Sequence, residues 1–209
     1  MKIASIVATA IVFLSLPSVL DAAEQTQTIT LVPGWNAVWL EVQPEDASGR
    51  PASPETVFAA HAEVDIVSRL LPAKSPVEFV SDPTASSLGA DIWLRWRRST
   101  VIGQNTLGGM RGNSAYLIQN SSAAPINVSI TGEVAFHTYD WVPDSYNFVG
   151  VPVGADGGQA PTFGEFFGAS SAHPVSRIFK LSAGQWVSVR ENDRIVQGAA
   201  YWVYCRGGS

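Results

Sequence analysis

Two arginines and a tryptophan alternate along one short stretch, and they are the strongest candidates for chemistry in the chain. Trp93, Arg95 and Arg97 stand two residues apart within 91–98. Successive side chains of a strand point to opposite faces of a sheet, so these three would share one face. An indole beside two guanidinium groups can stack on a sugar ring or hold a carboxylate. We therefore predict Trp93, Arg95 and Arg97 as ligand-binding residues.

The same stretch has a purely structural interpretation. Arginines on an edge strand prevent pairing with other chains and form ion pairs with nearby acids. Aromatic and charged residues also alternate on many strands that bind no ligand. Most other large aromatic residues recur at matching places in the two halves of the chain, which favours packing over a carbohydrate platform. We expect these residues in the core or between the halves: Trp35, Trp39, Trp186, Trp202, Tyr116 and Tyr201.

No local motif predicts catalysis or metal binding. The sequence lacks Gly-x-Ser-x-Gly, His-Glu-x-x-His, a phosphate-binding loop and a dinucleotide fingerprint. His61, His137 and His173 have no second ligand at metal-binding spacing. Asp140 and Asp144 alone do not make a calcium loop. We expect no catalytic residues, no metal and no cofactor.

The N-terminal residues have the three parts of a secretory signal peptide. Met1 and Lys2 precede the apolar run Ile3–Leu16, which is followed by Pro17 and the small residues at 22–23. The run is shorter than the roughly 20 residues that a membrane-spanning helix needs. We predict that residues 1–23 are removed on export, and that the mature protein is secreted or held at a bacterial cell surface.

Charge and cysteine content narrow the partners. The net charge of −5 gives no basic footprint for nucleic acid or for an anionic membrane. Arginine outnumbers lysine, which weakly favours fixed pairing with carboxylates. Cys205 is the only cysteine, so we expect a buried thiol and no disulfide within the chain. No later stretch is apolar enough to span a bilayer. The partners we expect are a glycan or further surface modules.

One strand pattern occurs twice. In 33–42 and in 144–153, a turn residue precedes an aromatic residue, an asparagine and a mostly apolar run. This order is typical of a buried strand that is entered through a tight turn. We expect the two asparagines, Asn36 and Asn147, to bond to the backbone where each strand begins.

Further matched segments follow in the same order in both halves. A cap residue, a proline and an early acid predict a short helix that starts at Ser53, and 161–167 is the matching short helical or turn segment of the second half. Val67–Leu71 resembles Val175–Phe179, and Ala115–Ile118 resembles Ala200–Val203. The spacing indicates an insertion in the first half, at about residues 81–105, which holds the candidate strand.

These patterns predict a mainly β fold, with α+β as the fallback. We expect two tandem pseudo-repeats of antiparallel strands, each with one short helix. The first lobe would comprise residues 24–132 and the second lobe residues 133–209.

Three of these segments resemble an aromatic repeat of large exported bacterial proteins. They are Gly34-Trp35-Asn36, Gln185-Trp186-Val187 and Gly198–Val203. The second half departs from the pattern because Tyr146 stands in place of the tryptophan. That repeat carries no established activity and occurs beside other extracellular modules, so the resemblance implies an accessory module and supplies no catalytic residues.

The sequence therefore predicts a non-enzymatic secreted or cell-surface structural or binding module. Two alternatives remain open. One is a carbohydrate-binding module that uses the region of Trp93. The other is a hydrolase whose site is assembled from residues distant in sequence.

Overall fold

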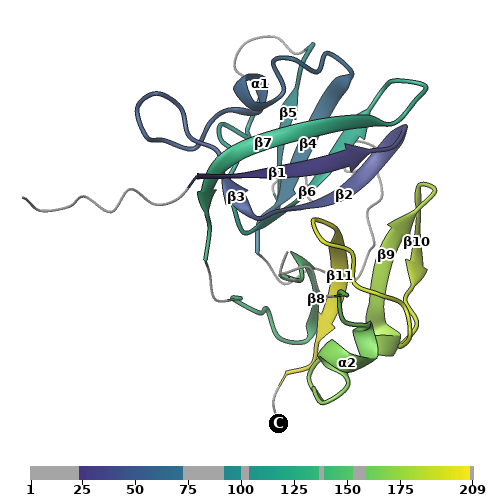
Figure 1. Ribbon diagram of the computed structural model, residues 1–209. Coiled ribbons are helices and arrows are strands. Elements are labelled where there is room, and N and C mark those ends of the chain that lie inside the picture. Colours follow the sequence, from purple (N-terminus) through teal and green to yellow (C-terminus); the bar gives the residue numbers. More distant parts are fainter. Residues whose placement is uncertain (1–23, 73–91, 100–103, 137–138, 153–158, 208–209) are drawn as a thin grey trace, which may run out of the picture.

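The computed structural model describes residues 24–72, 92–99, 104–136, 139–152 and 159–207, so the predicted signal peptide lies outside the described part. The fold is mainly β, as the sequence predicts, and its elements are shown in Figure 1. In chain order they are β1 (Glu24–Leu31), β2 (Gly34–Leu40), β3 (Val42–Gln43), α1 (Pro54–Val57), β4 (Val64–Leu70), β5 (Trp93–Arg97), β6 (Ser114–Asn120), β7 (Ile126–Val134), β8 (Ser145–Gly150), α2 (Phe163–Phe167), η2 (Val175–Arg177), β9 (Ile178–Ser182), β10 (Gln185–Ser188) and β11 (Ala200–Cys205). Within these ranges, no helix is both long and apolar enough to cross a membrane.

The strands form three antiparallel sheets. The outer sheet has the order β1-β7-β3, the N-sheet has the order β2-β6-β4-β5, and the C-sheet has the order β8-β11-β9-β10. In Figure 1, β1 and β7 of the outer sheet cross in front of the N-sheet. The C-sheet lies in the lower part of the picture, together with α2. The two four-stranded sheets have matching strand orders: β2, β6, β4 and β5 of the N-sheet correspond to β8, β11, β9 and β10 of the C-sheet.

Three clusters of buried side chains hold these layers together. The first lies between the outer sheet and the N-sheet, and includes Leu31, Leu40, Tyr116 and Val128. The second lies between the N-sheet and the C-sheet, and includes Trp39, Trp93, Phe148 and Trp202. The third lies between the C-sheet and α2, and includes Phe163, Phe167, Ile178 and Tyr201.

Strand β2 explains why its sequence reads as an almost continuous apolar run. Val38 and Leu40 face the outer sheet, whereas the intervening Trp39 faces the C-sheet. Successive side chains of a strand point to opposite faces, so a strand that is covered on both faces needs apolar residues at every position. The N-sheet is the middle layer of the molecule for this reason.

A short helix is present in each predicted segment, and the side chain of the residue just before each helix caps its first turn. Ser53 Oγ accepts a hydrogen bond from Thr56 N at the start of α1. In α2, Thr162 Oγ1 accepts from Glu165 N at 3.2 Å, and Glu165 accepts from Thr162 N at 2.7 Å. This reciprocal pair satisfies backbone donors that a helix start leaves without partners.

The sheet register corrects one matched pair of segments. Val67 pairs with Ile118 in the N-sheet, and Ile178 pairs with Val203 in the C-sheet. The counterpart of Val67 is therefore Ile178, because Val175 lies in the 3-10 turn before β9. A short apolar pattern repeats within a few residues, and only strand pairing fixes which repeat is equivalent.

The predicted lobe boundary after residue 132 falls inside β7. Glu133 still pairs with Glu24 of β1, and Val134 pairs with Val42 of β3. The strand continues past the predicted boundary because its last residues complete the outer sheet.

Candidate ligand-binding site at the junction of the sheets

Trp93 is not displayed on the surface, so its predicted role as an exposed stacking platform is wrong. It is 3% exposed and packs against Phe148 of the C-sheet, with ring centroids 6.3 Å apart. Trp96, on the other face of β5, is also buried. The sequence pattern gave the alternation of the two faces correctly, but the C-sheet covers the face that was expected to meet solvent.

The two arginines of β5 differ in exposure. Arg95 is partly buried and Arg97 is exposed. Their backbone is held by the following loop, since Arg95 N donates to Thr106 Oγ1 and Arg97 N donates to Asn105 Oδ1, both at 2.9 Å. This loop covers the open edge of the strand. A role of Arg95 and Arg97 in ligand binding stays a prediction.

Strand β5 also has a counterpart in the C-sheet. Trp93 pairs with Leu70 in the N-sheet, and Trp186 pairs with Leu181 at the matching place in the C-sheet. The extra length of the first half therefore lies between β4 and β5. In the C-sheet the corresponding connection is the short turn at Ala183 and Gly184. Residues 73–91 of the longer connection lie outside the described residues.

The two asparagines of the repeated pattern have the same bonding arrangement, as predicted. Asn36 Oδ1 accepts from Val32 N, and its Nδ2 donates to Val32 O and Gly34 O. Asn147 Oδ1 accepts from Val142 N, and its Nδ2 donates to Val142 O and Ser145 O. Each side chain satisfies backbone groups where the chain enters an edge strand.

In each four-stranded sheet, one buried tyrosine fixes the loop before the closing strand, the strand that comes last in the chain, which is β6 in the N-sheet and β11 in the C-sheet. The Tyr116 hydroxyl bonds to both N and O of Arg111, at 2.7 and 3.0 Å. The Tyr201 hydroxyl bonds in the same way to Val196, at 2.9 and 3.5 Å. Burial raises the pKa of Tyr116, while its bond to Arg111 and the charge of Arg69 act in the opposite direction.

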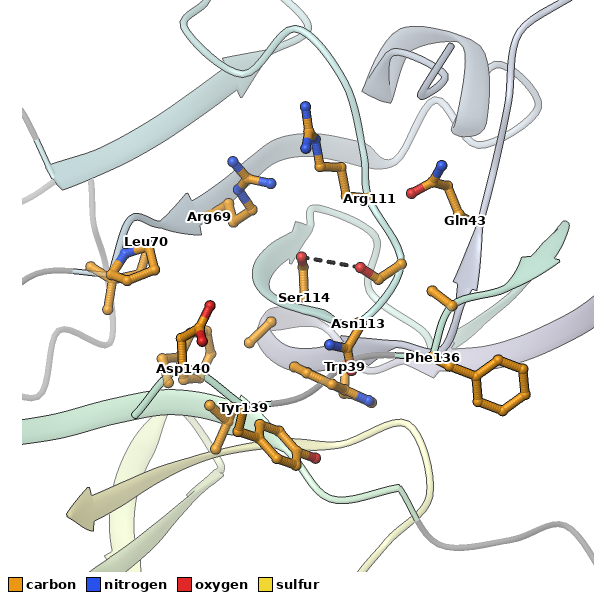
Figure 2. A pocket seen from close by; sticks show the side chains of 16 residues that line it. Trp39, Gln43, Arg69, Leu70, Arg111, Asn113, Ser114, Phe136, Tyr139 and Asp140 are labelled. Carbon is orange, nitrogen blue, oxygen red and sulfur yellow. Dashed lines mark hydrogen bonds between the residues drawn. The ribbon is translucent and has the colours of Figure 1, made fainter. Parts of the chain in front are cut away.

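A cleft of about 490 Å³ lies where the N-sheet, the C-sheet and the segment after β7 meet. We call it the junction cleft. One wall carries Arg69, Arg111 and Ser114, and Figure 2 shows Tyr139 and Asp140 on the opposite wall. Guanidinium, hydroxyl and carboxylate groups thus line one space, beside the apolar ring of Phe148. Such a mixture of a few polar groups with apolar walls is typical of small-molecule sites.

Local structure holds these groups in place. Asn113 adopts a left-handed conformation, with φ of 54°, and its N–H donates to Leu40 O at 2.6 Å. Ser114 Oγ donates to Gly112 O at 3.3 Å, as the dashed line in Figure 2 shows. On the opposite wall, the Tyr139 hydroxyl donates to Gly150 O at 2.7 Å. Burial, with a smaller contribution from Glu41, raises the pKa of Tyr139 well above its usual value.

The cations of the cleft are not paired with acids. Among the described residues, neither Arg69 nor Arg111 forms a salt bridge with a carboxylate. Lys180, in the C-sheet, contrasts with them because it contacts Asp193 at 2.9 Å. Arginine keeps its charge when partly buried, so the cleft wall is electropositive in an acidic protein.

Sequence reasoning missed the junction cleft because Arg69 and Arg111 come from separate segments. Only the excess of arginine over lysine pointed toward fixed pairing with carboxylates.

Cys205 is buried, and burial followed by the charge of Asp144 raises the pKa of its thiol. No group of three metal-ligating residues was found in the part of the chain that the structure describes.

No protein-family model, no curated protein and no solved structure matches this chain. The resemblance to the aromatic repeat of exported bacterial proteins therefore stays a prediction.

Proposed function

We propose that the protein is a non-enzymatic module of the bacterial cell exterior, built by internal duplication, that binds a ligand in the junction cleft. The duplicated scaffold supplies rigidity, and the cleft between its halves supplies recognition. The observation that carries the proposal is the convergence of two arginines and several polar side chains on one cleft.

The internal duplication is supported by hydrogen bonds as well as by strand order. Met110 N donates to Ala52 O at 2.8 Å, and Ile195 N donates to Pro161 O at 3.0 Å. Each bond joins the loop before the closing strand to the segment before the short helix. Agreement between such distant contacts is hard to obtain from local sequence similarity alone.

Binding at the cleft is supported by the way the aromatic residues are used. Trp93 and Trp202 are each 3% exposed and pack between the sheets, so they offer no ring face to a ligand, whereas Trp39 packs there and also lines the cleft. The polar side chains of the cleft are instead directed into an open space. A pocket on which a few polar groups converge is the default candidate for a binding site.

A fragment screen by protein-observed NMR on residues 24–209 tests this proposal. We expect the hits to shift the backbone signals of Asn113 and Ser114, and to weaken in Arg111→Ala. Arg190→Ala is the matched control, because Arg190 is exposed and lies outside the cleft. Hits that bind elsewhere, or that are equally strong in both variants, would contradict the proposed site.

Export needs a separate experiment. Expression of the full chain in a bacterial host should give a protein outside the cytoplasm that lacks residues 1–23, as measured by mass spectrometry of the secreted or periplasmic fraction. A chain that keeps residue 1 and stays in the cytoplasm would contradict the exported location.

Carbohydrate binding is the second candidate, and an exposed aromatic ring favours it. Phe136 is 91% exposed and borders the junction cleft. Aromatic rings at the mouth of a polar cleft can stack on sugar rings. Glycan-array screening should then give hits that Phe136→Ala removes. Hits that persist in this variant would count against stacking on Phe136.

A further inference from the structure

An ion pair in the C-sheet has no equivalent in the N-sheet. Lys180 Nζ contacts Asp193 Oδ2 at 2.9 Å, and the same oxygen accepts from Arg190 N at 3.3 Å. The hydrogen bond from Lys180 is the main reason why the pKa of Asp193 is lowered. In the C-sheet, a carboxylate from the loop before the closing strand therefore neutralises the cation.

Register identifies the matching positions in the N-sheet. Arg69 pairs with Tyr116, just as Lys180 pairs with Tyr201. The tyrosine hydroxyls bond five residues back along the chain, to Arg111 and Val196 respectively. Gly108 lies three residues before Arg111, and Asp193 lies three residues before Val196, so Gly108 stands at the position of Asp193. The cation is therefore retained, and the acid is replaced by a glycine.

A hollow lies where the missing carboxylate would stand. It has a volume of about 340 Å³ and is lined by Arg50, Arg69, Arg111 and Gly108, among others. We call it the arginine hollow. A Cβ placed on Gly108 would meet no atom within 4 Å, so the space beside this glycine is open.

The charges around the arginine hollow are strongly one-sided. Its described lining residues include three arginines and no acid. Asp46 does not line the hollow, but its Oδ2 lies 4.0 Å from Arg50 Nε, so Arg50 has an acidic partner. Asp140 lies across the junction cleft, on the wall opposite Arg69. Bringing like charges together in an acidic protein costs free energy unless an anion compensates them.

We propose that the arginine hollow binds a carboxylate carried by the ligand, in the place that Asp193 occupies in the C-sheet. The inference rests on the proposed function, because Arg69 and Arg111 also line the junction cleft and the rest of the ligand would occupy that cleft. Guanidinium groups match a carboxylate with two parallel hydrogen bonds, which selects this anion by shape as well as by charge.

Titration with small acids tests the proposal directly. Glucuronate and succinate are the probes, and glucose is the neutral counterpart of glucuronate. We expect at least one of the acids to bind residues 24–209 at millimolar concentration, whereas glucose binds more weakly. Arg69→Gln and Arg111→Gln should each weaken acid binding by about tenfold, because each removes charge-assisted hydrogen bonds. Arg190→Gln is the control and should bind as the unaltered protein does, because Arg190 is exposed and lines neither cavity.

Preference between the probes identifies the source of the carboxylate. Binding of glucuronate alone indicates a sugar acid, and binding of succinate alone indicates a short organic acid. Failure of both acids, or binding that is unchanged in Arg69→Gln and Arg111→Gln, overturns the inference. If neutral fragments still bind in the junction cleft, the proposed function holds and only the carboxylate site is contradicted. If no ligand binds in the cleft, both the proposed function and the carboxylate site are contradicted.

Restoring the missing acid gives a sharper test. Gly108→Asp places a carboxylate opposite Arg69, so it should abolish binding of the acids. Gly108→Asn has nearly the same shape without the charge, and should retain most of the binding. A Cβ at Gly108 meets no atom within 4 Å, so neither substitution displaces a neighbour at this first side-chain atom. Equal loss of binding in the two variants would mean that the added side chain blocks the hollow by its size, and that its charge has no effect. This result would contradict the proposal.

Discussion

Asn36 and Asn147 show how one side chain can organise the start of a strand. Each accepts one bond from a nearby backbone N–H and donates to two nearby carbonyls, and Asn36 also donates to Ile118 O at 3.4 Å. Both asparagines are buried. A side chain without an amide cannot satisfy a backbone N–H and two carbonyls together, so these positions depend on asparagine chemistry rather than on size.

Asn36→Ala should therefore lower the free energy of unfolding by about 1–3 kcal/mol, since it leaves partly buried backbone groups without partners. Urea denaturation of residues 24–209 measures this change. Asn127→Ala is the control, because Asn127 is exposed and its side chain accepts one bond from Thr30. Equal losses in the two variants would show that the bonds of Asn36 add no stability.

His173 is a residue whose protonation opposes folding. Its ring lies 4.3 Å from the ring of Trp141, and its Nδ1 is 2.8 Å from Ser170 Oγ. Burial lowers the pKa of His173 below the ordinary value of 6.5. The unfolded chain therefore binds a proton at a higher pH than the folded protein does.

Stability should consequently fall as the pH decreases from 6.5 toward the lowered pKa of His173, because only the unfolded state gains the proton in that window. Thermal unfolding between pH 7 and pH 5 should show a smaller decrease for His173→Gln than for the unaltered protein. His61→Gln changes a histidine outside this aromatic cluster and should keep the full decrease. Identical profiles for all three proteins would contradict the role of His173.

At the scale of elements, the β9–β10 hairpin has a tight turn with an unfavourable residue. Ala183 and Gly184 both have positive φ, at 47° and 76°. Two-residue hairpin turns need positive φ at both central positions, which glycine and asparagine adopt more easily than alanine. The turn keeps its geometry because the register of β9 and β10 fixes both of its ends.

Ala183→Asn should raise the free energy of unfolding by about 1 kcal/mol, because it relieves the left-handed strain of alanine. Gly184→Ala should lower it by a similar amount for the opposite reason. Differential scanning calorimetry measures both shifts. A loss of stability in Ala183→Asn would contradict the strain at this turn.

At the scale of the whole molecule, the two four-stranded sheets share one core. Trp39 of the N-sheet stacks on Tyr139, with ring centroids 6.0 Å apart, and lies against Gly150 at the end of β8. Trp39 N also donates to Gly198 O at 2.7 Å, so the backbones of the two halves are joined directly. Burial of large aromatic faces from both sheets makes separate unfolding of the halves unfavourable.

Gly150→Ala should disrupt this junction. A Cβ at Gly150 would clash with the side chain of Trp39, so the indole or one of the two strands would have to shift. We expect a loss of about 3 kcal/mol, as for overpacking in a dense core, and weaker ligand binding in the junction cleft. Gly108→Ala is the control, because the space beside Gly108 is open. Chemical denaturation followed by tryptophan fluorescence measures both variants, and unchanged stability in Gly150→Ala would contradict close packing of the sheets.

The sequence by itself determined the local features of this protein. Alternation and turn residues located β2, β8 and most other strands, capping residues located α1, and the repeat placed a short helical or turn segment at α2. The roles of Asn36 and Asn147 also followed from sequence, because their partners lie within five residues. These signals are short-range, so they survive without knowledge of the fold.

Only the tertiary structure decided what happens to Trp93 and where the unpaired cations gather. The alternation of β5 was correct, but the stacking of the C-sheet buries Trp93 of the expected binding face in the core. Arg69 and Arg111 meet because β4 lies beside β6 and Tyr116 holds the intervening loop. The absence of an acid at Gly108 acquires meaning only when strand register aligns it with Asp193. Sheet stacking and register arise from contacts between distant segments, which local patterns in the sequence do not specify.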